Sequence, residues 1–265
     1  MRIARFSIDG HVAFGAVEGD GPPGSTDGLV VNIIKGIPFA DFELSGTRVP
    51  LDQVRLLPPV LPSKVIGIGR NYADHAAELG NEVPSTPVSF LKPSTSVVGH
   101  RDPVAYPSFS RDVHYEAELA VVIGRLCRDV PRERVKDVIL GYTCANDITA
   151  RDVQRSDGQW TRAKGFDGAC PLGPWVETGI DLATAGDLTV QCTVNGQQRQ
   201  LGNTKDMVRS IEDLVVHLTE AMTLLPGDVI LTGTPAGVGP LNVGDEVAVT
   251  IEGIGTLTNK VIQRG

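Results

Sequence analysis

Long apolar runs are missing from this 265-residue sequence, because none approaches the roughly 18 residues that a membrane-spanning helix needs. The N-terminus, MRIARFSIDG, contains two arginines but no apolar stretch and no small-residue cleavage site. A basic excess is missing too, since 24 lysines and arginines face 32 aspartates and glutamates, for a formal net charge of −8. A membrane span, secretion and a main role in binding nucleic acid or an anionic membrane surface are therefore disfavoured.

Cysteine is scarce, and its spacing contains no C-x-x-C pair. The four cysteines are Cys127, Cys144, Cys170 and Cys192. A chain of this length buries enough apolar surface to fold without disulfides. We therefore expect reduced thiols in a cytoplasmic protein.

Glycine and proline are abundant instead, at 30 and 18 residues, and they bound short alternating or β-branched runs. These runs predict strands at 1–8, 11–17, 64–67, 118–123, 188–194, 229–231, 246–251 and 256–262. Asp9 and Gly10 separate the first two runs and predict a tight hairpin, because both central positions of such a turn need positive φ. Strand is therefore expected to be the dominant element.

One long helix is predicted after Ser210, a candidate N-cap that is followed three residues later by Asp213. Apolar residues recur at helical spacing from there until Pro226 and Gly227 end the pattern. Shorter helices are predicted at 74–79, 131–138 and 148–155.

The stretch 36–62 is rich in proline and indicates a boundary. Its prolines are Pro38, Pro50, Pro58, Pro59 and Pro62. We interpret 1–60 as a small N-terminal β domain with its linker, and 61–265 as the main domain.

Two carboxylates stand at the head of an apolar run. In a strand, Glu116 and Glu118 point to one face while Leu119, Val121 and Ile123 point to the other. Like charges about 6 to 7 Å apart in a partly buried place repel and raise each other's pKa, unless a cation or protons lie between them. A metal ion would remove this conflict. The alternative is a solvent-facing strand end.

A third carboxylate, Asp147, follows the apolar run 138–145. Three oxygen ligands without a set of cysteines or histidines suit a hard cation, Mg²⁺ or Mn²⁺. Asp147 is alternatively the N-cap of the helix that follows. His114 shares the parity of the two glutamates, but a supporting or structural role suits it better than ligation.

His75 and Glu78 are three residues apart on a predicted helix and therefore share one face. A carboxylate that accepts from one ring nitrogen orients the imidazole and leaves the other nitrogen to take a proton from water. The alternative is an exposed helical pair. The polar, proline-rich segment 80–87 that follows is typical of a mobile lid. Nearby, Arg70 is a candidate for binding a substrate carboxylate, or it pairs with Asp152 or Glu78.

Several common site motifs are missing. The glycine-rich stretch 232–239 lacks the Gly-Lys-Ser/Thr ending of a P-loop, and no Gly-x-Gly-x-x-Gly opens a βαβ unit. No Gly-x-Ser-x-Gly is present either. Nucleotide binding and serine-hydrolase chemistry are therefore unsupported.

An ordered set of short motifs resembles the fumarylacetoacetate hydrolase family. The motifs are KVIGIGRNY at 64–72, FLKP at 90–93, Glu-x-Glu at 116–118, NDxTARDxQ at 146–154, KG at 164–165 and LTGTP at 231–235. The resemblance implies a β-rich α+β fold, a mixed β-sandwich or β-roll with peripheral helices, in a homodimer. The catalytic domain would then be 61–265.

The resemblance also implies the site. It implies Mg²⁺ or Mn²⁺ on Glu116, Glu118 and Asp147, and a catalytic dyad of His75 and Glu78 on a closing lid. Further residues that it places against the substrate are Gln154, Lys164 and Thr234. Read without the resemblance, these three residues are equally well helix surface, a surface lysine and a turn residue.

The expected function is cleavage of a carbon–carbon bond in a small 2-oxo acid through a metal-stabilised enolate, with Lys164 supporting the enolate oxygen. Acylpyruvate hydrolysis and oxaloacetate decarboxylation both fit. One alternative is isomerisation of 2-hydroxyhepta-2,4-diene-1,7-dioate. Another is a non-enzymatic, β-rich ligand-binding protein with a structural acidic cluster.

Overall fold

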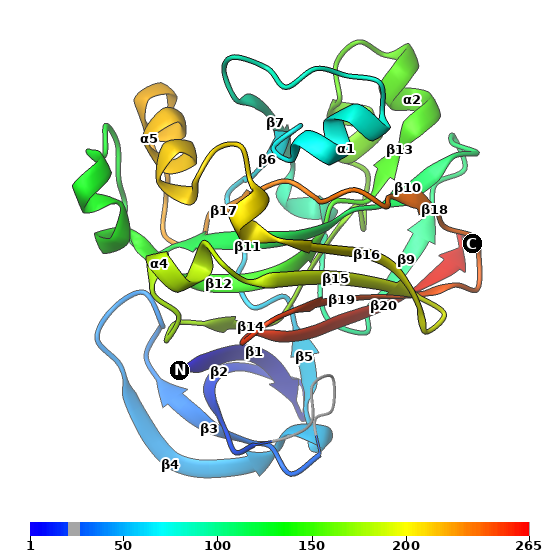
Figure 1. The fold of residues 1–265 in the computed structure, drawn as a ribbon. Helices are drawn as coiled ribbons and strands as arrows, with labels where there is room; N and C mark the ends of the chain where they lie inside the picture. The colour runs from blue at the N-terminus through cyan, green and yellow to red at the C-terminus, as the bar shows by residue number, and fades with distance from the viewer. Residues whose placement is uncertain (21–26, 265) are drawn as a thin grey trace.

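A large mixed sheet forms the frame of the computed structural model, which describes residues 1–20 and 27–264 (Figure 1). Its strands follow the order β4 (Glu43–Pro50), β3 (Val30–Lys35), β2 (His11–Glu18), β1 (Arg2–Ile8), β14 (Cys170–Glu177), β12 (Ile139–Asn146), β11 (Ala117–Ile123), β17 (Val229–Leu231), β6 (Val65–Gly69) and β7 (Val88–Lys92). Two short strands join off this path, β5 (Arg55–Leu57) beside β1 and β8 (Val97–Val98) beside β14.

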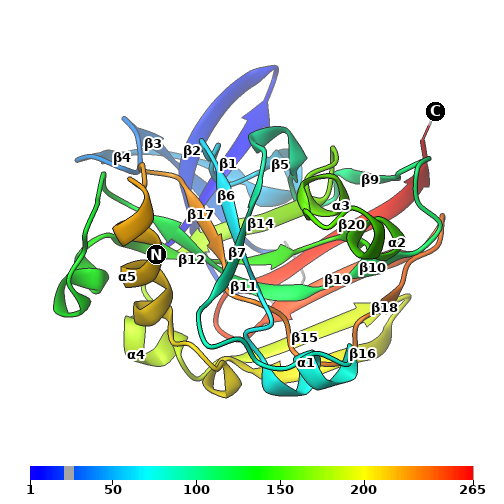
Figure 2. The same cartoon turned by 90° about the horizontal axis from the view of Figure 1, so that it is seen from above.

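A second sheet packs on the middle of the first. Its order is β16 (Gln197–Asn203), β15 (Thr189–Val194), β19 (Glu246–Ile251), β20 (Gly255–Gln263) and β9 (Pro103–Tyr106). Contacts of β15, β19 and β20 with β11, β12 and β14 join the two layers (Figure 2). A small third sheet holds β13 (Thr149–Ala150), β10 (Val113–Tyr115) and β18 (Gly239–Pro240). The expected β-rich fold with peripheral helices is confirmed.

Strand β11 lies inside the protein with both faces covered. Leu119 and Val121 belong to the core between the two sheets, whereas Ala120 and Val122 belong to a second core on the opposite face. The face of β11 that carries Glu118 is therefore shielded from solvent, like the opposite face. The four cysteines are free, as expected, and all four are buried; burial raises the pKa of Cys144, Cys170 and Cys192 to about 12.

The local sequence signals predict most elements correctly. Each of the eight predicted strands is present, and the hairpin turn has positive φ at Asp9 (49°) and Gly10 (78°). Helix α5 (Ile211–Ala221) begins with the predicted capping box between Ser210 and Asp213. The other helices of the described chain are α1 (Ala73–Glu78), α2 (Arg151–Ser156), α3 (Thr161–Lys164) and α4 (Leu182–Ala185), with short 3₁₀ turns η1 (Leu51–Gln53), η2 (Ser94–Ser96), η3 (Arg132–Asp137) and η4 (Thr204–Asp206). None of these helices is long and apolar enough to cross a membrane.

Two helix predictions need correction. The segment predicted as a helix at 131–138 forms only the 3₁₀ turn η3. The helix predicted at 148–155 starts later, because Thr149 and Ala150 pair with β10 and only then does α2 begin at Arg151. A tertiary strand pairing thus overrides helical spacing here.

The N-terminal strands extend the large sheet and have their own core around Phe6 and Trp175. Strand β1 joins this unit to the rest of the protein through the pairing of Arg2 with Glu177 in β14. The proline-rich stretch 36–62, interpreted as a boundary, contains strands β4 and β5. Pro50 ends β4, so at this position proline stops a strand and does not mark an irregular linker.

His100 links stability to pH. Burial, with help from Arg101, lowers its pKa to about 4, and its Nδ1 accepts a hydrogen bond from the Thr258 amide at 3.1 Å. Between pH 6.5 and 4 this histidine is therefore protonated in the unfolded state but still neutral in the folded state. The free energy of unfolding thus decreases as the pH falls through this window.

We expect this histidine to remove roughly 3 kcal/mol of unfolding free energy between pH 7 and pH 4. Urea unfolding at several pH values should show a shallower pH dependence in His100→Gln than in the wild type. His11→Gln, at an exposed position, is the matched control. Parallel pH profiles for His100→Gln and the wild type would contradict the assignment.

Candidate active site

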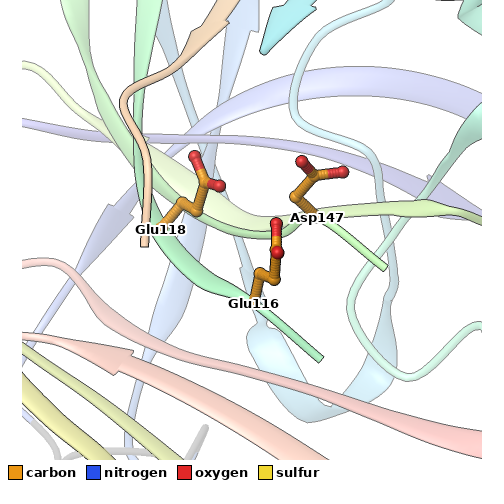
Figure 3. Close-up of side chains that lie close together, drawn as sticks. All are labelled: Glu116, Glu118 and Asp147. Carbon is orange, nitrogen blue, oxygen red and sulfur yellow. The ribbon is translucent and has the colours of Figure 1, made fainter. Parts of the chain in front are cut away.

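Three carboxylates meet where β11 and β12 lie side by side. Ala117 pairs with Asn146, which brings Glu116 and Glu118 beside Asp147 at the end of β12. One oxygen from each carboxylate lies within 4.8 Å of the other two (Figure 3). The residues are only 4%, 2% and 1% exposed, so a solvent-facing strand end is wrong. Asp147 is not an N-cap either, since Ala150 precedes α2.

Three buried cations surround the carboxylates. Lys164 donates to Glu116 Oε2 at 2.8 Å, to Asp147 Oδ2 at 2.6 Å and to the Thr149 hydroxyl at 2.8 Å. Arg151 donates to Glu116 Oε1, and Lys92 Nζ lies 2.8 Å from Asp147 Oδ1. Lys164 is therefore not a surface lysine. Three negative charges face three positive charges in a space shielded from water.

The buried cations compensate the three carboxylates unequally. Burial would raise the pKa of Glu116, but Arg151, Lys164 and His75 outweigh it and hold that pKa below its ordinary value. Burial together with the charges of Asp147 and Glu116 raises the pKa of Glu118 well above its ordinary value. Glu118 accepts a hydrogen bond from the Gly233 amide at 2.6 Å, and no ion-pair partner for it exists among the described residues. The need for a further cation is therefore concentrated at Glu118.

The histidine and the glutamate on α1 form the predicted pair. His75 Nδ1 lies 3.3 Å from Glu78 Oε2, and Nε2 on the other side of the ring lies 3.8 Å from Glu116 Oε1. The Gly237 amide donates to Glu78 Oε1 at 3.0 Å and so fixes that carboxylate. The alternative of an exposed helical pair is wrong, because His75 is buried. Its imidazole lies between Glu78 and the carboxylate cluster.

A cavity of about 240 Å³ opens onto these groups. Of the residues predicted for the site, its wall contains Arg70, His75, Glu116, Glu118, Gln154, Lys164 and Thr234. Glu78 and Asp147 do not line the cavity, but each contacts a residue that does: Glu78 contacts His75, and Asp147 contacts Lys164. Gln154 is held by Arg151 at 2.9 Å, and the Thr234 hydroxyl accepts from Gln200 at 2.8 Å.

His114 stays outside the cavity, whereas Arg70 lines it but has neither of its suggested acidic partners. His114 contacts Asp112 at 2.8 Å and does not line the cavity, in agreement with a structural role. Arg70 pairs with neither suggested partner: Asp152 bonds to Ser110, and Glu78 is taken by His75 and Gly237.

Sequence reasoning assigned no role to Lys92 or Arg151, although both lie in the quoted motifs. Lys92 is fully buried and donates to the carbonyl oxygens of Lys164 and, at 2.9 Å, Ala169, besides facing Asp147. A single lysine before a proline gives no sign of burial in the sequence. Only the packing of β7 against the Lys164 segment reveals it.

Replacing Lys92 by Met should destabilise the protein by about 3–5 kcal/mol, because it removes the buried cation beside Asp147 Oδ1 and a donor to the carbonyl oxygens of Lys164 and Ala169. Urea unfolding measures this loss. Lys136→Met, at an exposed lysine, is the control and should stay within about 0.5 kcal/mol. A loss below about 1 kcal/mol for Lys92→Met would show that the buried ion pair is not needed.

Taken together, the fold and site define a β-rich protein whose acidic cluster could hold a metal ion beside a small-molecule cavity. Residues 64–262 match the family model described as fumarylacetoacetate (FAA) hydrolase C-terminal, and residues 1–59 match a model described as Rv2993c-like, N-terminal. The chain belongs to the fumarylacetoacetate hydrolase family. The non-enzymatic alternative is thereby set aside.

Relatives in this family carry different names. Oxaloacetate tautomerase YcgM of Escherichia coli is 45% identical over 76% of this chain and 93% of that protein. A structure described as 2-hydroxyhepta-2,4-diene-1,7-dioate isomerase from Mycobacterium marinum has 46% identity and a TM-score of 0.92, covering 100% of this chain and 99% of that one. Maleylpyruvate hydrolase from Sphingobium sp. SYK-6, in complex with manganese(II) and pyruvate, has 34% identity and a TM-score of 0.80, with both chains fully covered.

Proposed function

We propose that this enzyme binds Mg²⁺ or Mn²⁺ through Glu116, Glu118 and Asp147 and acts on a small 2-oxo acid through an enolate. Carbon–carbon cleavage is the favoured outcome, as acylpyruvate hydrolysis or oxaloacetate decarboxylation. The observation that carries the proposal is the buried carboxylate triad in contact with Lys164 and next to the His75–Glu78 pair.

The residues fit a hard divalent cation. The group consists of carboxylates alone, and oxygen donors suit Mg²⁺ and Mn²⁺ whereas cysteine and histidine ligands would favour zinc. Glu118 is a buried carboxylate beside two others with no ion-pair partner in the described chain, and a cation there would relieve the repulsion. The name of the Sphingobium structure, with manganese(II) and pyruvate, supports both the ion and a 2-oxo acid.

A bound divalent cation supplies Lewis acidity, which stabilises negative charge on a 2-oxo oxygen. Lys164, which is buried, adds a positive charge at the same place. His75, oriented by Glu78, is positioned to take a proton from a water molecule that attacks an acyl carbon. Gln154 and Thr234, each fixed by a hydrogen bond, present polar groups that orient the substrate.

Proton transfer without bond cleavage is the second candidate. An enolate that gains a proton at another atom gives isomerisation or keto–enol tautomerisation, and the same residues support both. The names oxaloacetate tautomerase and 2-hydroxyhepta-2,4-diene-1,7-dioate isomerase among the relatives favour this candidate.

One set of assays separates the candidates. The protein is incubated with oxaloacetate or acetylpyruvate in Mg²⁺, in Mn²⁺ and in EDTA. Release of pyruvate identifies cleavage, and a change in enol absorbance without pyruvate release identifies tautomerisation. We expect turnover that requires the divalent ion. Full turnover in EDTA would contradict the proposed requirement for a divalent ion. The absence of any reaction with either 2-oxo acid would contradict the proposed substrate class.

The homodimer stays a prediction that rests on the family resemblance. Sedimentation at micromolar concentration should give a particle of twice the 28.2 kDa chain mass. A particle of 28.2 kDa would contradict it.

A further inference from the structure

Arg70 is a partly buried arginine in the cavity wall whose guanidinium has no hydrogen-bond or ion-pair partner in the described part of the chain. Its backbone has φ of 59°, a left-handed conformation that a residue with a Cβ adopts only at an energetic penalty. A strained residue with an unpaired charge at a cavity is typical of a group kept for a ligand. The Arg70 guanidinium is therefore a candidate for binding an anionic group of a ligand.

The sheet register places Arg70 about two strands away from Glu118, and both residues line the cavity. Strand β17 lies between β11 and β6, with Leu231 paired to Ala120 on one side and to Gly67 on the other. Counting along this register puts Gly69 level with Glu118, two strands away, which is about 10 Å at the usual strand spacing. Arg70 follows Gly69 and lines the cavity, so its long side chain starts about this far from Glu118 and can reach the other end of a ligand held there.

The charges of the site favour a ligand with two negative charges. Lys92, Lys164 and Arg151 already balance the three carboxylates in number. Arg70 is additional, and a divalent cation adds two more positive charges. Arg155, which also lines the cavity, is neutralised by Asp112 at 2.7 Å. Among the arginines and lysines of the wall, Arg70 is thus the one without an acidic partner in the described residues.

We propose that Arg70 binds the distal carboxylate of the substrate and makes the enzyme selective for short 2-oxo dicarboxylates over 2-oxo acids with an uncharged end. The inference rests on the proposed function, because the 2-oxo acid end of the ligand must sit at the carboxylate triad. A guanidinium matches a carboxylate in a two-bond fork, which gives both affinity and a fixed orientation.

A matched pair of probes tests this inference. 2-Oxoglutarate and 2-oxopentanoate have the same chain and the same 2-oxo acid head, and they differ in a carboxylate against a methyl group at the far end. Calorimetric titration of the Mg²⁺-loaded protein should show about 10- to 100-fold tighter binding of 2-oxoglutarate, as one charge-assisted contact provides.

The variants assign the preference to Arg70. Arg70→Met should abolish the preference by weakening 2-oxoglutarate alone, and Arg70→Lys should retain part of it. Arg70→Gly should lose the preference while its thermal midpoint is not lowered, because glycine adopts positive φ without strain. Arg155→Met is the control within the same cavity and should keep the preference within threefold.

The outcomes separate the two proposals. Equal binding of the two probes to the wild type, or equal weakening of both in Arg70→Met, overturns the role of Arg70 and leaves the proposed function standing. Binding of neither probe to the wild type overturns both.

Discussion

Glu118→Gln is expected to abolish turnover, by about 10³-fold or more, and to weaken Mg²⁺ binding by at least roughly 100-fold without lowering the stability of the metal-free protein. Among the described residues no buried cation pairs with Glu118, unlike the other two carboxylates of the triad, and its repulsion with Asp147 and Glu116 disappears in the variant. The amide side chain keeps an oxygen that can accept from the Gly233 amide. Calorimetry with Mg²⁺ and thermal unfolding in EDTA measure the two effects.

Glu116→Gln is the contrasting variant. It removes the partner of Arg151 and Lys164, so two buried cations lose a negative neighbour and the protein should be destabilised by about 3–5 kcal/mol. The same change of side chain therefore has opposite consequences for stability at two positions only two residues apart. Unchanged Mg²⁺ affinity in Glu118→Gln would contradict the proposed metal ligands.

His75→Ala is expected to lose about 10² to 10⁴-fold in acylpyruvate hydrolysis, the usual contribution of a positioned general base, with Mg²⁺ affinity unchanged. The imidazole contacts Glu78 on one side and stands 3.8 Å from Glu116 on the other, next to the triad but outside it. Steady-state kinetics and Mg²⁺ calorimetry on the same preparation separate base catalysis from metal binding.

Glu78→Gln is the companion variant. It should impair hydrolysis less than His75→Ala, because the amide can still accept from Gly237 while its effect on the imidazole is weaker. Oxaloacetate decarboxylation needs no attacking water and should suffer less in both variants. Acylpyruvate hydrolysis at the wild-type rate in His75→Ala would show that this histidine has no part in catalysis.

Sequence reasoning predicted the triad because its signals are local. The period of two in a strand puts Glu116 and Glu118 on the same side, and a polar residue at the end of the next apolar run marks Asp147. The i, i+3 spacing likewise predicted the contact between His75 and Glu78. Each of these inferences needs only the geometry of one element or of two neighbouring ones.

The counter-ions depend on contacts between distant segments. Lys92 in β7 meets Asp147 after β12, and Arg151 in α2 turns back to Glu116. Nothing in the spacing of these residues predicts such contacts, since β7 and β12 are separated in the sheet by β6, β17 and β11. The late start of α2 has the same origin, because pairing with β10 holds Thr149 and Ala150 extended.

By itself the sequence determined the β-rich fold, its turns, the long capped helix, the family and the residues that meet at the site. The tertiary structure decided which of those residues are buried, which charges compensate one another, and that Glu118 and Arg70 are left without an ion-pair partner in the described chain. The physical reason is that propensity and periodicity act over a few residues. Desolvation and ion pairing depend instead on the whole packed environment, and segments far apart in the chain supply it.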